Sequence, residues 1–170
     1  GTIADLIDYK LSKESTIENV HTKDVTTEFG EFKLNVWRDV IFDEYHFSLT
    51  KGFPEKVDVP MVRVQTQSVL QDTLGIDEIG KKWSIRKSLQ KIAEEGTGVF
   101  VLINHRDAKT YWLSSLKDEN VEPKRNRRVI GIGSQILRAI GLNKIKVLGT
   151  PTKYSGLSGF NIEIEGFIDE

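Results

Sequence analysis

A continuous apolar run, Val99 to Ile103, follows a segment with helical periodicity at residues 84–95. Apolar residues recur in that segment at i, i+4, i+7 and i+8, which predicts a helix with one buried face. They are Ile85, Leu89, Ile92 and Ala93. Ser84 can cap the start of this helix, and Gly96 can end it. Because the apolar run predicts a buried strand, a helix that leads into it is typical of α/β layered folds.

The first third of the chain shows the period of two that is typical of half-buried strands. Residues 15–37 predict strands around a turn at Thr27–Phe32. The alternation is repeated by Tyr45, Phe47 and Leu49, and ends at Lys51-Gly52. We therefore expect an antiparallel sheet here, with His46 on its outward face.

The remaining segments complete an α/β fold with a layered mixed sheet and helices. A second helix closes at Leu137 to Gly141, and residues 144–148 and 161–168 predict the last strands. Residues 62–75 predict a strand that breaks into a polar turn. Strand ends of this kind often carry sites, and an ordinary strand–loop junction is the simpler alternative.

Composition excludes several classes of protein. The 170 residues suit one domain with a sizeable core. A net charge of -1 indicates neither a nucleic-acid partner nor a membrane surface, and no apolar run approaches the length of a membrane span. The chain has no cysteine, so it has no disulfides. This composition, without a signal peptide, fits the cytoplasm.

The polar turn carries a resemblance to a known family. Residues 63–75 read R-V-Q-T-Q-S-V-L-Q-D-T-L-G. They resemble the segment R-V-H-S-E-C-L-T-G-D-V-F-G of GTP cyclohydrolase II, the zinc enzyme that opens riboflavin synthesis. Thr66 stands in for the serine, and Asp72 and Gly75 match the aspartate and the glycine. The distance from Gly75 to I-A-E-E-G at residues 92–96 is also that of the family.

The resemblance extends over nearly the whole chain. G-I-G-S-Q-I-L at residues 131–137 resembles G-I-G-A-Q-I-L, and residues 2–10 resemble the helix that closes the 3,4-dihydroxy-2-butanone 4-phosphate synthase domain. It implies a GTP cyclohydrolase II-like domain at residues 13–170, with residues 1–12 as the end of an upstream synthase domain or a linker. It also implies a homodimer, because the relatives are dimers. Thr2 can cap the short N-terminal helix.

This sequence differs from the family at the positions that bind zinc. The positions of the three zinc-binding cysteines are Ser68, Ile79 and Lys81. Neither an aliphatic side chain nor an ammonium can bind zinc, so we predict no zinc in this domain. The histidines at 21, 46 and 105 lack the spacing of a metal site. Magnesium would enter only with a nucleotide or in the upstream synthase domain.

The nucleotide machinery of the family is also reduced. The glycine-rich element after Ile103 is missing, and Trp112, Leu113 and Leu116 are expected to pack a shortened helix against the body. Base stacking on Trp112 is the alternative. The basic run 124–128 is expected to be a solvated loop, and a phosphate or nucleic-acid contact is the alternative.

A few residues match the ligand-binding positions of the family. Arg63, Thr66, Thr150 and Lys153 are the ligand-binding candidates. Arg128 falls where the family has an arginine proposed as nucleophile. Its acidic and tyrosine neighbours are Asn126 and Ile130 here, so Arg128 would be vestigial. The glycines of 131–134 could aim N–H groups at an anion, or allow close packing of a helix on the sheet.

Three functional hypotheses follow from these losses. The first is a cyclohydrolase II-like domain without GTP-hydrolysing activity that is a scaffold or regulator of a fused synthase. The second is an enzyme with a different, metal-independent chemistry on a nucleotide. The third is a module that still binds GTP or another phosphate ligand without turnover.

Overall fold

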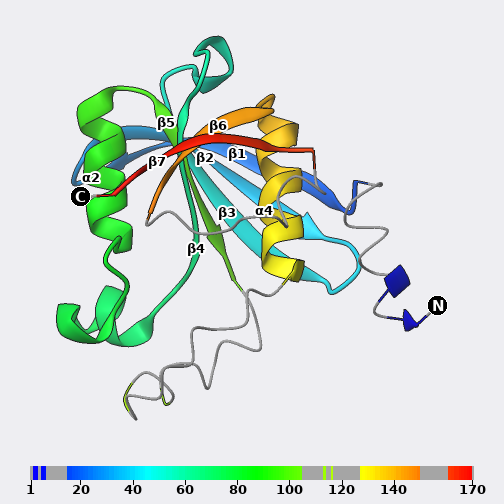
Figure 1. Ribbon diagram of the computed structural model, residues 1–170, viewed down its shortest axis with the longest axis horizontal. Coiled ribbons are helices and arrows are strands. Elements are labelled where there is room, and N and C mark those ends of the chain that lie inside the picture. The colour runs from blue at the N-terminus through cyan, green and yellow to red at the C-terminus, as the bar shows by residue number, and fades with distance from the viewer. Residues whose placement is uncertain are drawn as a thin grey trace.

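A seven-stranded mixed sheet forms the centre of the molecule (Figure 1). The computed structural model describes residues 2–3, 5–6, 15–104, 113, 116, 127–149 and 161–169. The sheet order is β1-β2-β3-β5-β4-β6-β7. The strands are β1 (Ile17–Thr27), β2 (Gly30–Asp39), β3 (Glu44–Lys51), β4 (Met61–Thr66), β5 (Gly98–Ile103), β6 (Lys144–Leu148) and β7 (Glu163–Ile168). The α-helices with assigned bounds are α2 (Ile85–Glu95) and α4 (Arg127–Ile140). The predicted α/β class is confirmed.

The sheet has an antiparallel half and a parallel half. Strands β1, β2 and β3 form the predicted antiparallel meander, and β5 pairs antiparallel with β3. Strand β4 then pairs parallel with both β5 and β6, and β7 pairs parallel with β6. Helix α2 provides the crossover between β4 and β5 that a parallel pair requires.

The predicted start and end of α2 are confirmed. The Ser84 hydroxyl accepts a hydrogen bond from the N–H of Lys87 at 3.1 Å. Gly96 ends the helix with φ 82°, a left-handed conformation that favours glycine. Leu89 and Ile92 are buried on the face that packs against the sheet.

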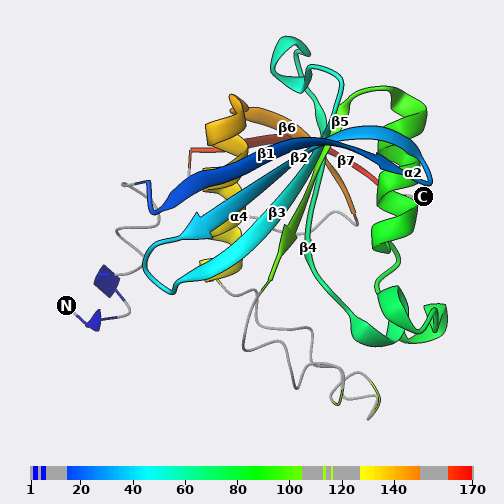
Figure 2. The same cartoon turned by 180° about the vertical axis from the view of Figure 1, so that it is seen from behind.

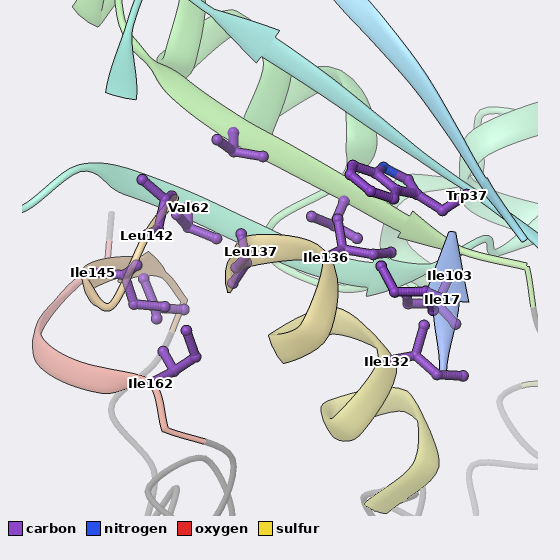
Figure 3. Close-up of a cluster of buried hydrophobic side chains, with 13 residues drawn as sticks. Ile17, Trp37, Val62, Ile103, Ile132, Ile136, Leu137, Leu142, Ile145 and Ile162 are labelled. Atoms are coloured by element: carbon purple, nitrogen blue, oxygen red, sulfur yellow. The ribbon is translucent and has the colours of Figure 1, made fainter. Parts of the chain in front are cut away.

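Helix α4 packs closely on the opposite face, which carries the larger apolar cluster (Figure 3). A methyl group on Gly133 would lie 2.9 Å from Cγ1 of Val64, so glycine allows the helix to approach β4. The glycines of 131–134 lie inside α4 and not before it. The prediction that these glycines form an anion site before the helix is therefore wrong, and the prediction that they allow the helix to pack closely on the sheet is confirmed.

The outward position predicted for His46 is wrong. His46 has no exposed surface, and its Nδ1 accepts a hydrogen bond from the N–H of Asn104 at 3.0 Å. On β3 the polar side chains point inward. They are Glu44, His46, Ser48 and Thr50. Ser48, for example, accepts a hydrogen bond from Nε1 of Trp37 at 2.9 Å. Tyr45, Phe47 and Leu49 alternate as predicted, but on the less buried face.

Two predicted helical segments fall largely outside the described residues. At the N-terminus, the Thr2 hydroxyl accepts a hydrogen bond from the N–H of Asp5 at 3.1 Å, as a cap would. Leu113 and Leu116 are 40% and 49% exposed, so the expected packing of these two side chains is wrong. Trp112 lies outside the described residues. No helix in the described part of the chain is long and apolar enough to cross a membrane.

Candidate functional site

The carboxyl end of β4 leads into a tightly folded loop. A π-helical turn (Val69–Thr73) and a 3-10 turn (Asp77–Ile79) follow the strand. The buried Gln71 carboxamide closes this loop, because it donates to the carbonyl of Lys81 at 2.7 Å and accepts from its N–H at 2.9 Å. Any side chain on Gly80 would overlap the Gln71 carboxamide. Local hydrogen bonds therefore fix the loop.

Ser68 caps the π-helical turn. Its hydroxyl accepts a hydrogen bond from the N–H of Gln71 at 3.3 Å. Its own N–H donates to Oδ2 of Asp72 at 2.7 Å. The side chain is thus used in the local fold of the loop, as is typical of serine at the start of a helical turn.

Lys81 reaches back to the end of β4. Its ammonium donates to the carbonyl of Thr66 at 3.0 Å and to the Thr66 hydroxyl at 3.2 Å. Burial and then the charge of Arg63 lower the pKa of Lys81 to about 8, against the opposing effect of Asp72. A cation therefore lies at the strand end.

Arg63 connects three segments of the chain at the same place. Its guanidinium donates to Oε1 of Gln65 at 2.7 Å, to the carbonyl of Leu148 at 2.9 Å and to the carbonyl of Trp83 at 3.3 Å. The predicted ligand-binding residues Arg63 and Thr66 both lie on β4 and both act on Lys81, Thr66 through its hydrogen bonds and Arg63 through its charge. Thr150 and Lys153 lie outside the described residues.

Arg128 lies on α4, on the other face of the sheet from Arg63. Its Nη2 forms a 2.5 Å ion pair with Oε2 of Glu44, and its guanidinium lies 3.5 Å from the centroid of the Phe42 ring. The two charged side chains are only 12% and 5% exposed. Arg128 thus belongs to a buried ion pair, and the expectation that residue 128 lies in a solvated loop is wrong. Residues 124–126 lie outside the described residues.

Sequence reasoning missed Glu44 and Gln71 as partners in this region. Glu44 is separated from Arg128 by about half of the chain, and only its place on the inward face of β3 could have indicated it. Gln71 stands in a polar turn, where nothing in the local pattern distinguishes a buried carboxamide from an exposed one.

Residues 18–169 match the model of one protein family, GTP cyclohydrolase II. The chain belongs to this family.

Similar proteins include a synthase and a riboflavin biosynthesis protein. The chain is 33% identical to a 3,4-dihydroxy-2-butanone 4-phosphate synthase of Pseudomonas aeruginosa, over 99% of this chain and 47% of that protein. It is 31% identical to the riboflavin biosynthesis protein RibBA of Cytophaga hutchinsonii, over 96% of this chain and 44% of that protein. The chain spans less than half the length of these relatives.

A solved structure shares the fold. It is RibBX, a two domain 3,4-dihydroxy-2-butanone 4-phosphate synthase from A. baumannii, with a TM-score of 0.68 and 29% identity. The match covers 100% of this chain and 45% of that chain.

The zinc of the cyclohydrolase II family does not fit the side chains at the positions matched to its cysteines. Ser68 caps a turn through its hydroxyl, and Ile79 has no donor atom. Lys81 places a cation at the strand end, where it would repel a metal ion.

Removing the Arg128 charge should destabilise this cyclohydrolase II domain. In Arg128→Met, Glu44 loses its buried cationic partner, so we expect the free energy of unfolding in urea to fall by about 3–5 kcal/mol. The double variant Arg128→Met/Glu44→Gln removes both charges and should recover part of that loss. Wild-type stability of Arg128→Met would show that the ion pair has no structural role.

The stability of the domain should depend on Lys81 at alkaline pH. The lowered pKa means that, between pH 8 and 10.5, the unfolded chain holds a proton at Lys81 that the folded chain has lost. The free energy of unfolding should therefore rise with pH across this window, relative to Lys81→Met. The neighbouring Lys82→Met, at an exposed lysine paired with Asp169, is the control and should keep the rise. Equal pH dependence of wild type and Lys81→Met would contradict this account.

Proposed function

We propose that this domain does not open the GTP ring and is a cytoplasmic scaffold or regulator of a 3,4-dihydroxy-2-butanone 4-phosphate synthase domain. The observation that carries the proposal is the hydrogen bonding of Lys81 to Thr66. It places an ammonium where the family chemistry needs a metal held by thiolates.

Zinc supplies chemistry that an ammonium does not. Zinc lowers the pKa of bound water to about 7 and polarises a carbonyl group. An ammonium can hold an anion, but it has no open coordination position for a water molecule. In this domain Lys81 instead ties the loop to β4, so its contacts support a structural role.

The partner is inferred from the relatives. The similar proteins include one named as a synthase and one described as a two domain synthase. In the proposed arrangement, the synthase lies upstream of residues 13–170 in the same chain, and the domain forms a homodimer. The domain needs no zinc, and magnesium would act in the synthase domain or with a nucleotide.

One observation favours a second candidate function, the residual binding of GTP or another phosphate ligand. Gln65 is 4% exposed, and its Nε2 has no hydrogen-bond partner among the described residues. The same carboxamide accepts from Arg63 through Oε1. A buried donor beside an arginine can bind an anion. Arg128 would then remain a vestigial arginine, held by Glu44.

The test measures the synthase rate and oligomeric state of the full protein before and after deletion of residues 13–170. A scaffold or regulator predicts that at least one of them changes, while circular dichroism shows that the remaining synthase domain is folded. A folded synthase with unchanged rate and unchanged oligomeric state would contradict the proposal. GTP titration of the Gln65→Leu variant tests the second candidate, which predicts that wild-type binding is lost.

A further inference from the structure

Lys81 carries an amine that is held in a fixed position at the end of β4. The Gln71 carboxamide bonds both the N–H and the carbonyl of Lys81, which fixes the backbone at this residue. The Lys81 Nζ lies 3.0 Å from the carbonyl oxygen of Thr66 and 3.2 Å from its hydroxyl oxygen. Figure 2 shows the loop between β4 and α2 on the side of the molecule away from α4. Lys81 and Thr66 both keep some exposed surface, so a small molecule can reach the amine from solvent.

The surroundings of Lys81 favour the neutral amine more than those of an exposed lysine do. Burial, and then the charge of Arg63, lower its pKa to about 8, and the charge of Asp72 acts in the opposite direction. Desolvation and a neighbouring cation are the conditions that make a lysine amine a nucleophile near neutral pH. Lys82, the next residue, is exposed, and its ammonium is paired with Asp169 at 2.6 Å. The two neighbouring lysines should therefore differ strongly in reactivity.

The hydrogen bonds of Lys81 leave its lone pair available for a reaction. In the neutral form the amine keeps two N–H groups, and the carbonyl and the hydroxyl of Thr66 accept both. The lone pair is then left to attack a carbon atom. Because the Thr66 hydroxyl oxygen accepts from Lys81, its own O–H can donate to the oxygen of an approaching carbonyl group. Thr66 would thus polarise the carbonyl group beside the nucleophile.

A pair of side chains suited to an anion lies on the same strand. Arg63 and Gln65 share one face of β4, and Nε of Arg63 donates to Oε1 of Gln65 at 2.7 Å. Gln65 is 4% exposed, and its Nε2 has no hydrogen-bond partner among the described residues. A buried donor without an acceptor is costly, and an anion on Arg63 would supply that acceptor. Because Thr66 directly follows Gln65, the fitting ligand is short, with an anion at one end and a carbonyl group at the other.

We propose that Lys81 captures a short phosphorylated ketone or aldehyde as an imine, with the phosphate bound by Arg63 and Gln65. The amine nitrogen attacks the carbonyl carbon, and the C–N bond forms as a proton moves from the nitrogen to the carbonyl oxygen. The resulting carbinolamine loses its hydroxyl group and the remaining nitrogen proton as water, and the C=N bond forms. The step uses no oxidant or reductant, and water reverses it. The inference deepens the second candidate function and rests on it for the phosphate end.

The test incubates the 170-residue chain with dihydroxyacetone phosphate and cyanoborohydride, which reduces an imine to a stable secondary amine. Mass spectrometry of the digested protein then locates the adduct, which we expect on Lys81. Lys81→Arg should lose the adduct, because arginine keeps N–H donors for Thr66 and forms no imine. The control Lys82→Met, at the neighbouring exposed lysine, should keep the adduct. Circular dichroism checks that both variants are folded.

Dihydroxyacetone, which lacks the phosphate, tests the anion end. Its half-saturating concentration should be at least about tenfold higher than that of dihydroxyacetone phosphate, and Gln65→Leu should remove most of this difference. Labelling of Lys82 as fast as Lys81 would overturn the proposal, and so would equal labelling by the two compounds. GTP binding that depends on Gln65, without an adduct on Lys81, would overturn the imine and leave the second candidate function standing. Formate release from GTP would contradict the proposed scaffold role and leave the adduct on Lys81 unexplained by it.

Discussion

The hydrogen bonds between Lys81 and Thr66 hold the loop that follows β4. They join the end of β4 to the segment after the 3-10 turn, and the Gln71 carboxamide closes the same loop from the other side. In a zinc protein, the metal contributes folding energy directly by linking such segments. Here the half-buried ammonium of Lys81 and the buried carboxamide of Gln71 link them, so the loop keeps its position through hydrogen bonds of its own side chains and backbone.

The two faces of the sheet carry different side chains. One face buries polar side chains of β3 under α4, where the Arg128–Glu44 ion pair is nearly enclosed. A buried pair of this kind does not guarantee a gain in stability, but it makes the loss of either partner costly. The other face carries Arg63 and the loop that follows β4, which hydrogen bonds hold in place. The domain therefore has a defined interior on one face and a fixed loop on the other.

Local pattern predicted the elements, whereas long-range contacts decided the side-chain roles. The periodicity of 84–95, the apolar run after it and the strand alternation all gave correct elements, because helices and strands follow local period. The alternation of β3 predicts the wrong face for His46, because it does not say which side is buried when polar residues point inward. The sequence around Arg128 predicts a loop, because its partner Glu44 is distant in the chain. The ammonium of Lys81 predicts that zinc does not bind, but the hydrogen bond of Lys81 to Thr66 follows only from the folded structure.

The most direct test of this account is to dialyse the purified chain against zinc, measure the bound metal, and assay formate release from GTP with zinc and magnesium present. We expect the chain to bind no stoichiometric zinc and to release no formate from GTP. One zinc per chain together with formate release would contradict it, because the ammonium of Lys81 could not then occupy the position that the metal requires.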